Sequence, residues 1–190
     1  SEDLVAFMLG DLRGKLEPVG RLDVLDGVGR KVLDHYARID DDRLDDPALA
    51  QQAKALTLLG SIRVKRADLP GAEQAFASAA ATSARLVARA PQDGTRLFDH
   101  AQNVYCLAFV QWKLDHVAAA ERGFAEYARL ADMLVQIDLK RADWRLEPAY
   151  ARSNLGTLLL EQGRYADALA AFEVARSGFK SASQKAPGDR

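Results

Sequence analysis

The residue types that most often catalyse reactions or bind metals are scarce in this chain, and their spacing does not assemble a site. There are three histidines, His35, His100 and His116, and one cysteine, Cys106. His100 and Cys106 are six residues apart, which turns them about 240° from each other around a helix. The sequence contains no phosphate-binding glycine loop, nucleophile motif or His-Glu-x-x-His segment. It therefore predicts no catalytic site, no metal site, no cofactor and no enzyme.

An acidic run is the one cluster that could suggest a cation site. It consists of Asp40, Asp41, Asp42, Asp45 and Asp46. A calcium-binding loop of this type needs a central glycine and a terminal glutamate that binds through both oxygens, and the run has neither. We interpret it as a solvated linker that caps the following helix.

Three aromatic residues have the spacing of a binding surface. Tyr105, Phe109 and Trp112 stand at positions i, i+4 and i+7, so they share one face of a helix. Exposed aromatic side chains are typical anchors for a partner protein. The alternative is that they are buried in ordinary packing between helices, and the sequence leaves both interpretations open.

The composition limits the classes of partner. The 190 residues are 48% hydrophobic and 28% charged, and 26 basic residues stand against 27 acidic ones, for a net charge of -1. A nucleic-acid-binding domain normally carries a clear positive excess. No apolar run approaches the roughly 18 residues that span a bilayer. We expect no nucleic-acid partner, no membrane association and, with one cysteine, a cytoplasmic location.

A repeat of 48 residues organises the elements that must position these side chains. The same residue types recur without any insertion at Leu59-Gly60, Leu107-Ala108 and Leu155-Gly156, at Ala53, Ala101 and Ala149, at Ala72, Ala120 and Ala168, and at Phe76, Phe124 and Phe172. Small residues at fixed columns let two helices approach closely, and stacked repeats close a core that one pair cannot close alone.

Each repeat is predicted to form two helices, and no strand is expected. Apolar residues at helical spacing place the helices at about 48–66, 69–90, 95–114, 116–137, 143–162 and 165–183. We expect Asp46 and Asp68 to cap the first two. Pro148 suggests that the fifth helix begins near Glu147. Upstream, a helix over about 19–39 and an apolar stripe, Leu4, Val5, Met8, Leu9 and Leu12, would cap the array.

The third repeat carries a family resemblance. Leu155, Gly156, Tyr165, Ala168, Phe172 and Ala175 match the consensus of the tetratricopeptide repeat (TPR) family, and the other repeats match more loosely. The family's repeat is about 34 residues, so about two further turns in each helix would absorb the difference. HEAT-like repeats are nearer in length but lack these columns. The resemblance implies a right-handed α-solenoid of three helix pairs (46–93, 94–141, 142–189 within 46–190), preceded by capping helices and a linker over 1–45.

The resemblance also implies a binding groove on the first helix of each pair. Carried over position by position, the groove candidates are Gln102, Tyr105, Phe109, Trp112 and Lys113, with Lys54, Tyr150, Ser153 and Thr157 on the flanking repeats. Thr57 and Ser61 stand where one subset of the family carries the Lys and Asn that grip a chaperone's C-terminal carboxylate, so that ligand is not expected.

Two functions follow as hypotheses. The first is a non-enzymatic interaction module, whose groove binds an extended or helical segment of a protein partner. Extended repeats of this kind resemble segments of large bacterial signalling proteins. The second is a structural spacer or homo-oligomerisation domain that pairs through the N-terminal apolar stripe, Leu4, Val5, Met8, Leu9 and Leu12.

Overall fold

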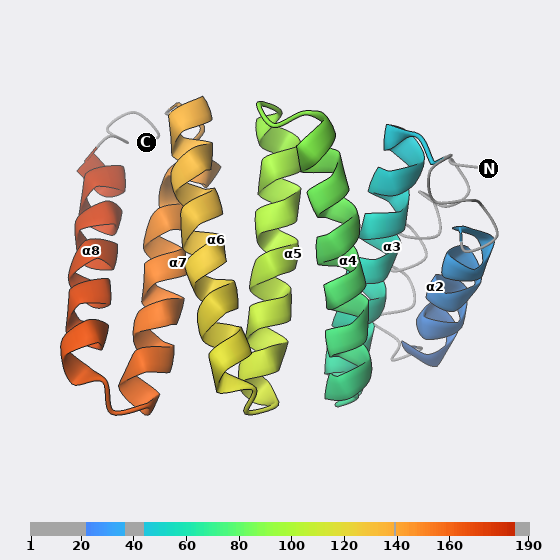
Figure 1. Ribbon diagram of the computed structural model, residues 1–190, viewed down its shortest axis with the longest axis horizontal. Coiled ribbons are helices and arrows are strands. Elements are labelled where there is room, and N and C mark those ends of the chain that lie inside the picture. The colour runs from blue at the N-terminus through green and yellow to red at the C-terminus, as the bar shows by residue number, and fades with distance from the viewer. Residues whose placement is uncertain (1–21, 37–43, 139, 185–190) are drawn as a thin grey trace. The chain divides into compact units, whose positions relative to one another are not determined.

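The computed structural model describes residues 22–36, 44–138 and 140–184, and throughout these ranges it contains α-helices and no strand. The helices (Figure 1) are α2 Leu22–Tyr36, α3 Asp46–Lys65, α4 Leu69–Arg89, α5 Gly94–Lys113, α6 Val117–Ile137, α7 Ala142–Glu161 and α8 Tyr165–Gln184. The all-α prediction is confirmed. The predicted bounds of α3 to α8 agree with the structure to within two residues.

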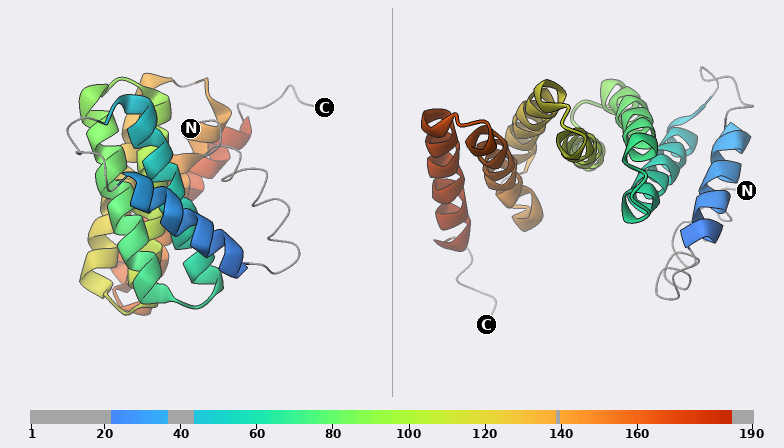
Figure 2. Two further views of the ribbon diagram at one scale, coloured as in Figure 1. Left: turned by 90° about the vertical axis from the view of Figure 1, so that its right-hand side faces the viewer. Right: turned by 90° about the horizontal axis from the view of Figure 1, so that it is seen from below.

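The helices pack in consecutive order inside two compact units, Ser1–Ala90 and Pro91–Arg190. In the first unit α2 packs on α3 and α3 on α4. In the second, α5 packs on α6, α6 on α7 and α7 on α8, and the right-hand view of Figure 2 shows α7 between α6 and α8. The architecture is thus a helical repeat built from the pairs α3–α4, α5–α6 and α7–α8.

The turn inside each pair repeats with the same 48-residue period. Its central residue has a positive φ at Ala67 (60°), Asp115 (60°) and Gly163 (74°). In the first turn the N–H of Asp68 donates to the carbonyl of Arg63 at 2.9 Å, and the N–H of Ala67 donates to that of Val64 at 3.0 Å. The other two turns have the same pair of bonds. This is the Schellman motif, which ends a helix and satisfies its last carbonyls.

The caps of α3 and α4 agree with expectation only in part. Asp68 caps α4 as predicted, and its side chain accepts from the N–H of Gly71 at 3.0 Å. The predicted cap of α3, Asp46, is wrong by one residue. Asp45 is the cap and accepts from the N–H of Ala48 at 2.9 Å, while Asp46 pairs with Arg89 at 2.7 Å. Proline is tolerated at either of the first two helical positions, because the N–H groups there have no partner within the helix.

The alternative start of α7 near Glu147, which Pro148 suggested, is wrong. The helix begins at Ala142, and Pro148 lies inside it. Proline removes one backbone hydrogen bond, but packing holds the preceding turn. Trp144 is only 5% exposed and fits against α5 where Gly94 has no side chain, and the Arg141 guanidinium covers its ring at 4.4 Å. These tertiary contacts therefore stabilise the helical turn that precedes Pro148, although proline disfavours it.

The small-residue columns form the close contacts within each pair. A Cβ added to Gly60 would lie 2.7 Å from the ring of Phe76, and one added to Gly156 would lie 2.9 Å from the ring of Phe172. Phe76 and Phe172 therefore lie over the glycine of their own pair. In the second pair, Ala108 occupies the glycine column and contacts Gly123 of α6.

The predicted N-terminal cap is described only for α2. This helix buries Leu25 and Asp26, and Asp26 holds it against the end of α3 by ion pairs to Arg63 at 3.6 Å and Arg66 at 3.3 Å. The apolar stripe at Leu4, Val5, Met8, Leu9 and Leu12 lies outside the described residues, as do Asp40, Asp41 and Asp42.

The repeated turn yields a stability prediction of opposite sign at two equivalent positions. Ala67→Gly should raise the free energy of unfolding by about 1 kcal/mol, and Gly163→Ala should lower it by about the same amount, because only glycine adopts a positive φ without steric cost. No atom lies within 4 Å of a Cβ built on Gly163, so the effect there is purely backbone. Urea unfolding followed by circular dichroism measures both. Equal signs for the two variants would contradict the assignment.

Candidate functional site

The aromatic row on α5 is neither fully buried nor fully exposed, so it matches neither of the two interpretations completely. Tyr105, Phe109 and Trp112 are partly buried and pack against a core of Ala108, Ala120, Phe124 and Leu158. The ring centroids of Tyr105 and Phe109 lie 6.2 Å apart, as do those of Phe109 and Trp112. Trp112 also meets Phe124 edge to face at 6.0 Å. Each ring is thus fixed on one side by the core and keeps part of its surface exposed.

The C-terminal end of the row carries polar groups beside the rings. The indole N–H of Trp112 donates to a carboxylate oxygen of Glu161 on α7 at 2.7 Å. The ammonium of Lys113 lies 5.0 Å from the Trp112 ring and 5.4 Å from the Phe109 ring. A cation over an aromatic face is attracted by the ring quadrupole. This attraction favours conformations of the exposed Lys113 side chain in which its ammonium lies close to the rings.

A buried carboxylate lies at the other end of the row. Glu147 of α7 is 8% exposed. It accepts hydrogen bonds from the Tyr127 hydroxyl at 2.5 Å and from the Gln102 amide at 2.8 Å. Burial and the bond to Glu147 raise the pKa of Tyr127, so its hydroxyl stays a donor. The predicted site residue Gln102 thus joins α5 to α7. Glu147 was not predicted, because its partners lie on other helices and no local pattern marks it.

The three candidates on α7 lie on the helix that α5 touches. Tyr150 is 47% exposed, and its ring meets that of Phe179 at 5.2 Å. Ser153 and Thr157 are partly buried, and the Thr157 hydroxyl donates to the Ser153 carbonyl at 2.9 Å. We use the name α5–α7 surface for these three together with the five α5 candidates: Gln102, Tyr105, Phe109, Trp112, Lys113, Tyr150, Ser153 and Thr157.

The remaining candidate, Lys54, belongs to the first unit, where it is exposed on α3. The hydroxyls of two nearby residues on the same helix, Thr57 and Ser61, form hydrogen bonds to backbone carbonyls of that helix. The Thr57 hydroxyl donates to the carbonyl of Ala53 at 2.8 Å, and the Ser61 hydroxyl donates to that of Thr57 at 2.9 Å. The structure therefore brings eight of the nine candidates into one unit and leaves Lys54 outside that group.

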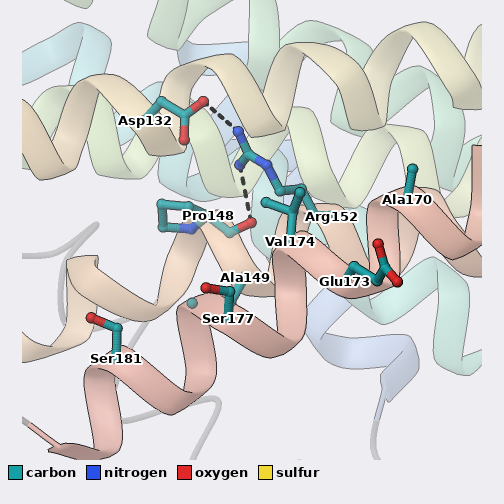
Figure 3. A pocket seen from close by; sticks show the side chains of 10 residues that line it. Asp132, Pro148, Ala149, Arg152, Ala170, Glu173, Val174, Ser177 and Ser181 are labelled. Atoms are coloured by element: carbon teal, nitrogen blue, oxygen red, sulfur yellow. Dashed lines mark hydrogen bonds and ion pairs between the residues drawn. The ribbon is translucent and has the colours of Figure 1, made fainter.

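A pocket that sequence reasoning missed lies elsewhere in the second unit. It has a volume of about 630 Å³. Figure 3 shows Arg152, which lines the pocket, donating to a carboxylate oxygen of Asp132 at 2.6 Å and to the Pro148 carbonyl at 3.1 Å. The α8 side is lined by Ala170, Glu173, Val174, Ser177, Gly178 and Ser181. None of the aromatic candidates lines it. Small residues on α8 make it, and nothing in their spacing distinguishes them from ordinary surface positions.

Burial shifts the pKa values of three ionisable side chains of α5 in the direction that favours their uncharged forms. Burial raises the pKa of the Cys106 thiol to about 11, whereas reactive cysteines have a lowered pKa. Burial also lowers the pKa of His100 and raises that of Tyr105. Among the residues that the structure describes, no three His, Cys, Asp or Glu side chains gather in a way that could hold a metal ion. His116 is exposed in the turn before α6.

Comparisons with known proteins identify no family for this chain. No protein-family model matches it, and no curated protein matches it. Among solved structures, the crystal structure of BtubC (BKLC) from P. vanneervenii matches with a TM-score of 0.48 and 15% sequence identity, over 99% of this chain and 83% of that chain. At this level the match carries no functional argument. Within the described ranges, no helix has the length and apolar character that crossing a membrane requires.

The buried carboxylate gives a second stability prediction. Tyr127→Phe should lower the free energy of unfolding by about 1–3 kcal/mol, because Glu147 stays buried and loses a donor. Tyr165→Phe is the matched control, since Tyr165 is 70% exposed, and it should change stability by less than about 0.5 kcal/mol. Chemical unfolding of both variants measures the difference. A Tyr127→Phe protein as stable as the parent would show that Glu147 does not depend on this bond.

The pKa of Cys106 predicts how its reactivity depends on pH. Since only the thiolate reacts, the rate of alkylation by iodoacetamide should rise about tenfold per pH unit from pH 7 to 9.5, without a plateau, while free cysteine levels off above about pH 8.5. Mass spectrometry of the modified chain measures the rate. A plateau near pH 8 would mean that burial does not raise the pKa of this thiol.

Proposed function

We propose that this chain is a non-enzymatic protein-interaction module of the TPR type, in which the α5–α7 surface binds an extended or helical segment of a partner protein. The observation that carries the proposal is the partly buried row of Tyr105, Phe109 and Trp112, whose rings pack against the core and keep part of their surface exposed. Aromatic side chains that are both rigid and accessible contribute most of the affinity in many interfaces.

The rigidity of the row supports binding because it lowers the entropic cost. Tyr105 contacts Phe124 and Tyr127 at centroid distances of 6.3 and 5.4 Å, and Trp112 is tied to Glu161 by its indole hydrogen bond. A partner segment then loses its own freedom but need not order these rings. Apolar side chains of the segment would cover the exposed edges of the rings.

Polar groups around the rings suit a partner backbone. Lys113 on α5 and the Glu161 carboxylate on α7 border the row. An ammonium can donate to a backbone carbonyl or an acidic side chain, and a carboxylate can accept from a backbone N–H. Apolar anchors with a polar border are the usual anatomy of a protein interface. The protonated thiol of Cys106 and the depressed pKa of His100 support binding rather than catalysis on this helix.

A peptide selection tests the proposal without a known partner. We expect peptides selected from a random display library against the chain to include segments that change Trp112 fluorescence. The chain has two tryptophans, and Trp144 is buried, so Trp144→Phe isolates the Trp112 signal. Phe109→Ala and Lys113→Glu should each weaken binding of such a peptide at least about tenfold, because both remove contacts at the row.

Charge and folding are controlled by separate measurements. Lys31→Glu makes the same charge change at an exposed residue of α2 in the first unit, and it should leave the peptide affinity within about threefold. Circular dichroism and thermal unfolding establish that Phe109→Ala is folded at the assay temperature. Selected peptides that bind the Phe109→Ala and Lys113→Glu chains as tightly as the parent would exclude the α5–α7 surface as the binding site.

A further inference from the structure

The pocket of the second unit lies apart from the α5–α7 surface, because none of the residues of that surface lines it. Its volume of about 630 Å³ falls within the range of sites that bind small molecules. It is bounded by α6, α7 and α8, which belong to one compact unit (Figure 3). The 48-residue repeat shows why this space is left open.

Long side chains occupy the equivalent positions of α6 in the second helix pair. The Arg129 guanidinium donates to the two carboxylate oxygens of Glu126 at 2.8 and 2.7 Å and to the sulfur of Met133 at 3.0 Å. Both charged groups also interact with His100 of α5. One repeat later, the positions of His100, Arg122, Glu126, Arg129 and Met133 hold Pro148, Ala170, Val174, Ser177 and Ser181, all of which line the pocket. The pocket thus forms where the third pair carries shorter side chains than the second.

The floor of the pocket is apolar. A Cβ added to Gly178 would lie 3.0 Å from the Cβ of Ala149, so the backbone of α8 approaches α7 closely there. Pro148 and Val174 extend the apolar lining, and Val174 is 52% exposed. An aliphatic group that covers these side chains removes apolar surface from water. The lining therefore favours a ligand with an aliphatic body.

The charges around the pocket favour a cationic head group. One positive and two negative side chains line it, Arg152, Asp132 and Glu173, which leaves one negative charge unbalanced. Arg152 is already paired with Asp132 at 2.6 Å. Glu173 stands where the second pair has Ala125, and it is exposed and makes no ion pair within the described part of the chain. Its carboxylate is therefore available to a guanidinium or ammonium group.

We propose that this pocket binds an organic cation with a short aliphatic body, of the kind that an arginine side chain carries. The aliphatic part lies on Pro148, Ala149 and Val174, and the cationic head pairs with Glu173. Such a ligand supplies the aliphatic chain and the cation that Arg129 supplies at the equivalent positions of the second pair. The site is separate from the aromatic row and goes beyond the binding of a partner segment there.

A titration with butylguanidinium tests the proposal, followed by two-dimensional amide NMR spectra of the whole chain. The amide signals of Ala149 and Gly178 should shift along a saturable curve in the millimolar range. Butylurea is the matched probe, because it is neutral and has the same number of non-hydrogen atoms. It should bind at least about threefold more weakly, since it cannot form the ion pair with Glu173.

A variant of Glu173 tests the head-group contact. Glu173→Gln should remove the preference, so that the two probes bind within about twofold of each other. Asp34→Asn makes the same charge change at an exposed residue of α2 in the first unit, and it should leave the preference for butylguanidinium as in the parent. A preference that Glu173→Gln leaves unchanged overturns the assignment of the cation to this carboxylate.

Filling the pocket tests its location. Val174→Glu combined with Ser177→Arg copies the Glu126–Arg129 pair of α6 onto α8 without changing the net charge. It should weaken butylguanidinium binding at least about tenfold, because its side chains occupy the space of the ligand. Both positions are exposed, so the fold should be retained, and circular dichroism verifies this. Unchanged binding by the folded variant overturns the proposal.

A peptide distinguishes the source of the cation. Tighter binding of acetyl-Ala-Arg-Ala-amide than of butylguanidinium assigns the pocket to an arginine of a partner segment, and equal or weaker binding assigns it to a free small cation. The absence of saturable shifts at Ala149 and Gly178 overturns the proposal for both sources. Equal binding of butylurea and butylguanidinium to the parent chain overturns the cationic class of ligand.

Discussion

Phe124 and Phe172 occupy the same repeat column, yet only Phe124 is fully removed from water, because α7 packs over the second pair. This difference expresses the constraint on which the rest of the structure depends. A pair of amphipathic helices closes one apolar seam between its two members and leaves a second apolar side open, so each pair requires a neighbour. The close approach at Gly60 and Gly156 closes the inner seam. The side that remains open determines which helices pack next and which residues stay accessible.

The aromatic row on α5 follows from this constraint. Tyr105, Phe109 and Trp112 lie where α5 meets α7. Their rings pack against a core cluster that includes Leu158 of α7, and each ring keeps part of its surface in contact with solvent. Full burial would make the row purely structural, and full exposure would leave its rotamers free. Partial burial gives rings that are ordered by packing yet able to contact another molecule, which is the property that a preorganised binding surface needs.

The repeat was predictable from the sequence because its determinants are local or strictly periodic. The spacing of apolar residues in a helix and the cap at Asp68 involve residues only a few positions apart in the sequence. The small-residue columns recur after one period of 48 residues. The errors arose where distant residues decide. Trp144 holds a helical turn ahead of Pro148, and Glu147 becomes a buried acceptor only when Gln102 and Tyr127 arrive from α5 and α6. The exposure of the aromatic row depends on three helices at once, so its spacing alone could not decide between core and surface.

The polar columns carry information that the small-residue columns cannot. Alanine recurs at Ala72, Ala120 and Ala168 with almost no exposure in all three pairs, so these columns close every pair in the same way and do not distinguish one pair from another. The contacts between the second and third pairs break that equivalence, because Glu121 meets Arg164 and Asp132 meets Arg152 at single positions of the repeat. The side chains of these two pairs are 24% to 45% exposed, so each pair contributes little to stability, but a wrong order or register would lose both. Small residues therefore close each helix pair, and the non-repeating polar residues favour one neighbouring pair over another.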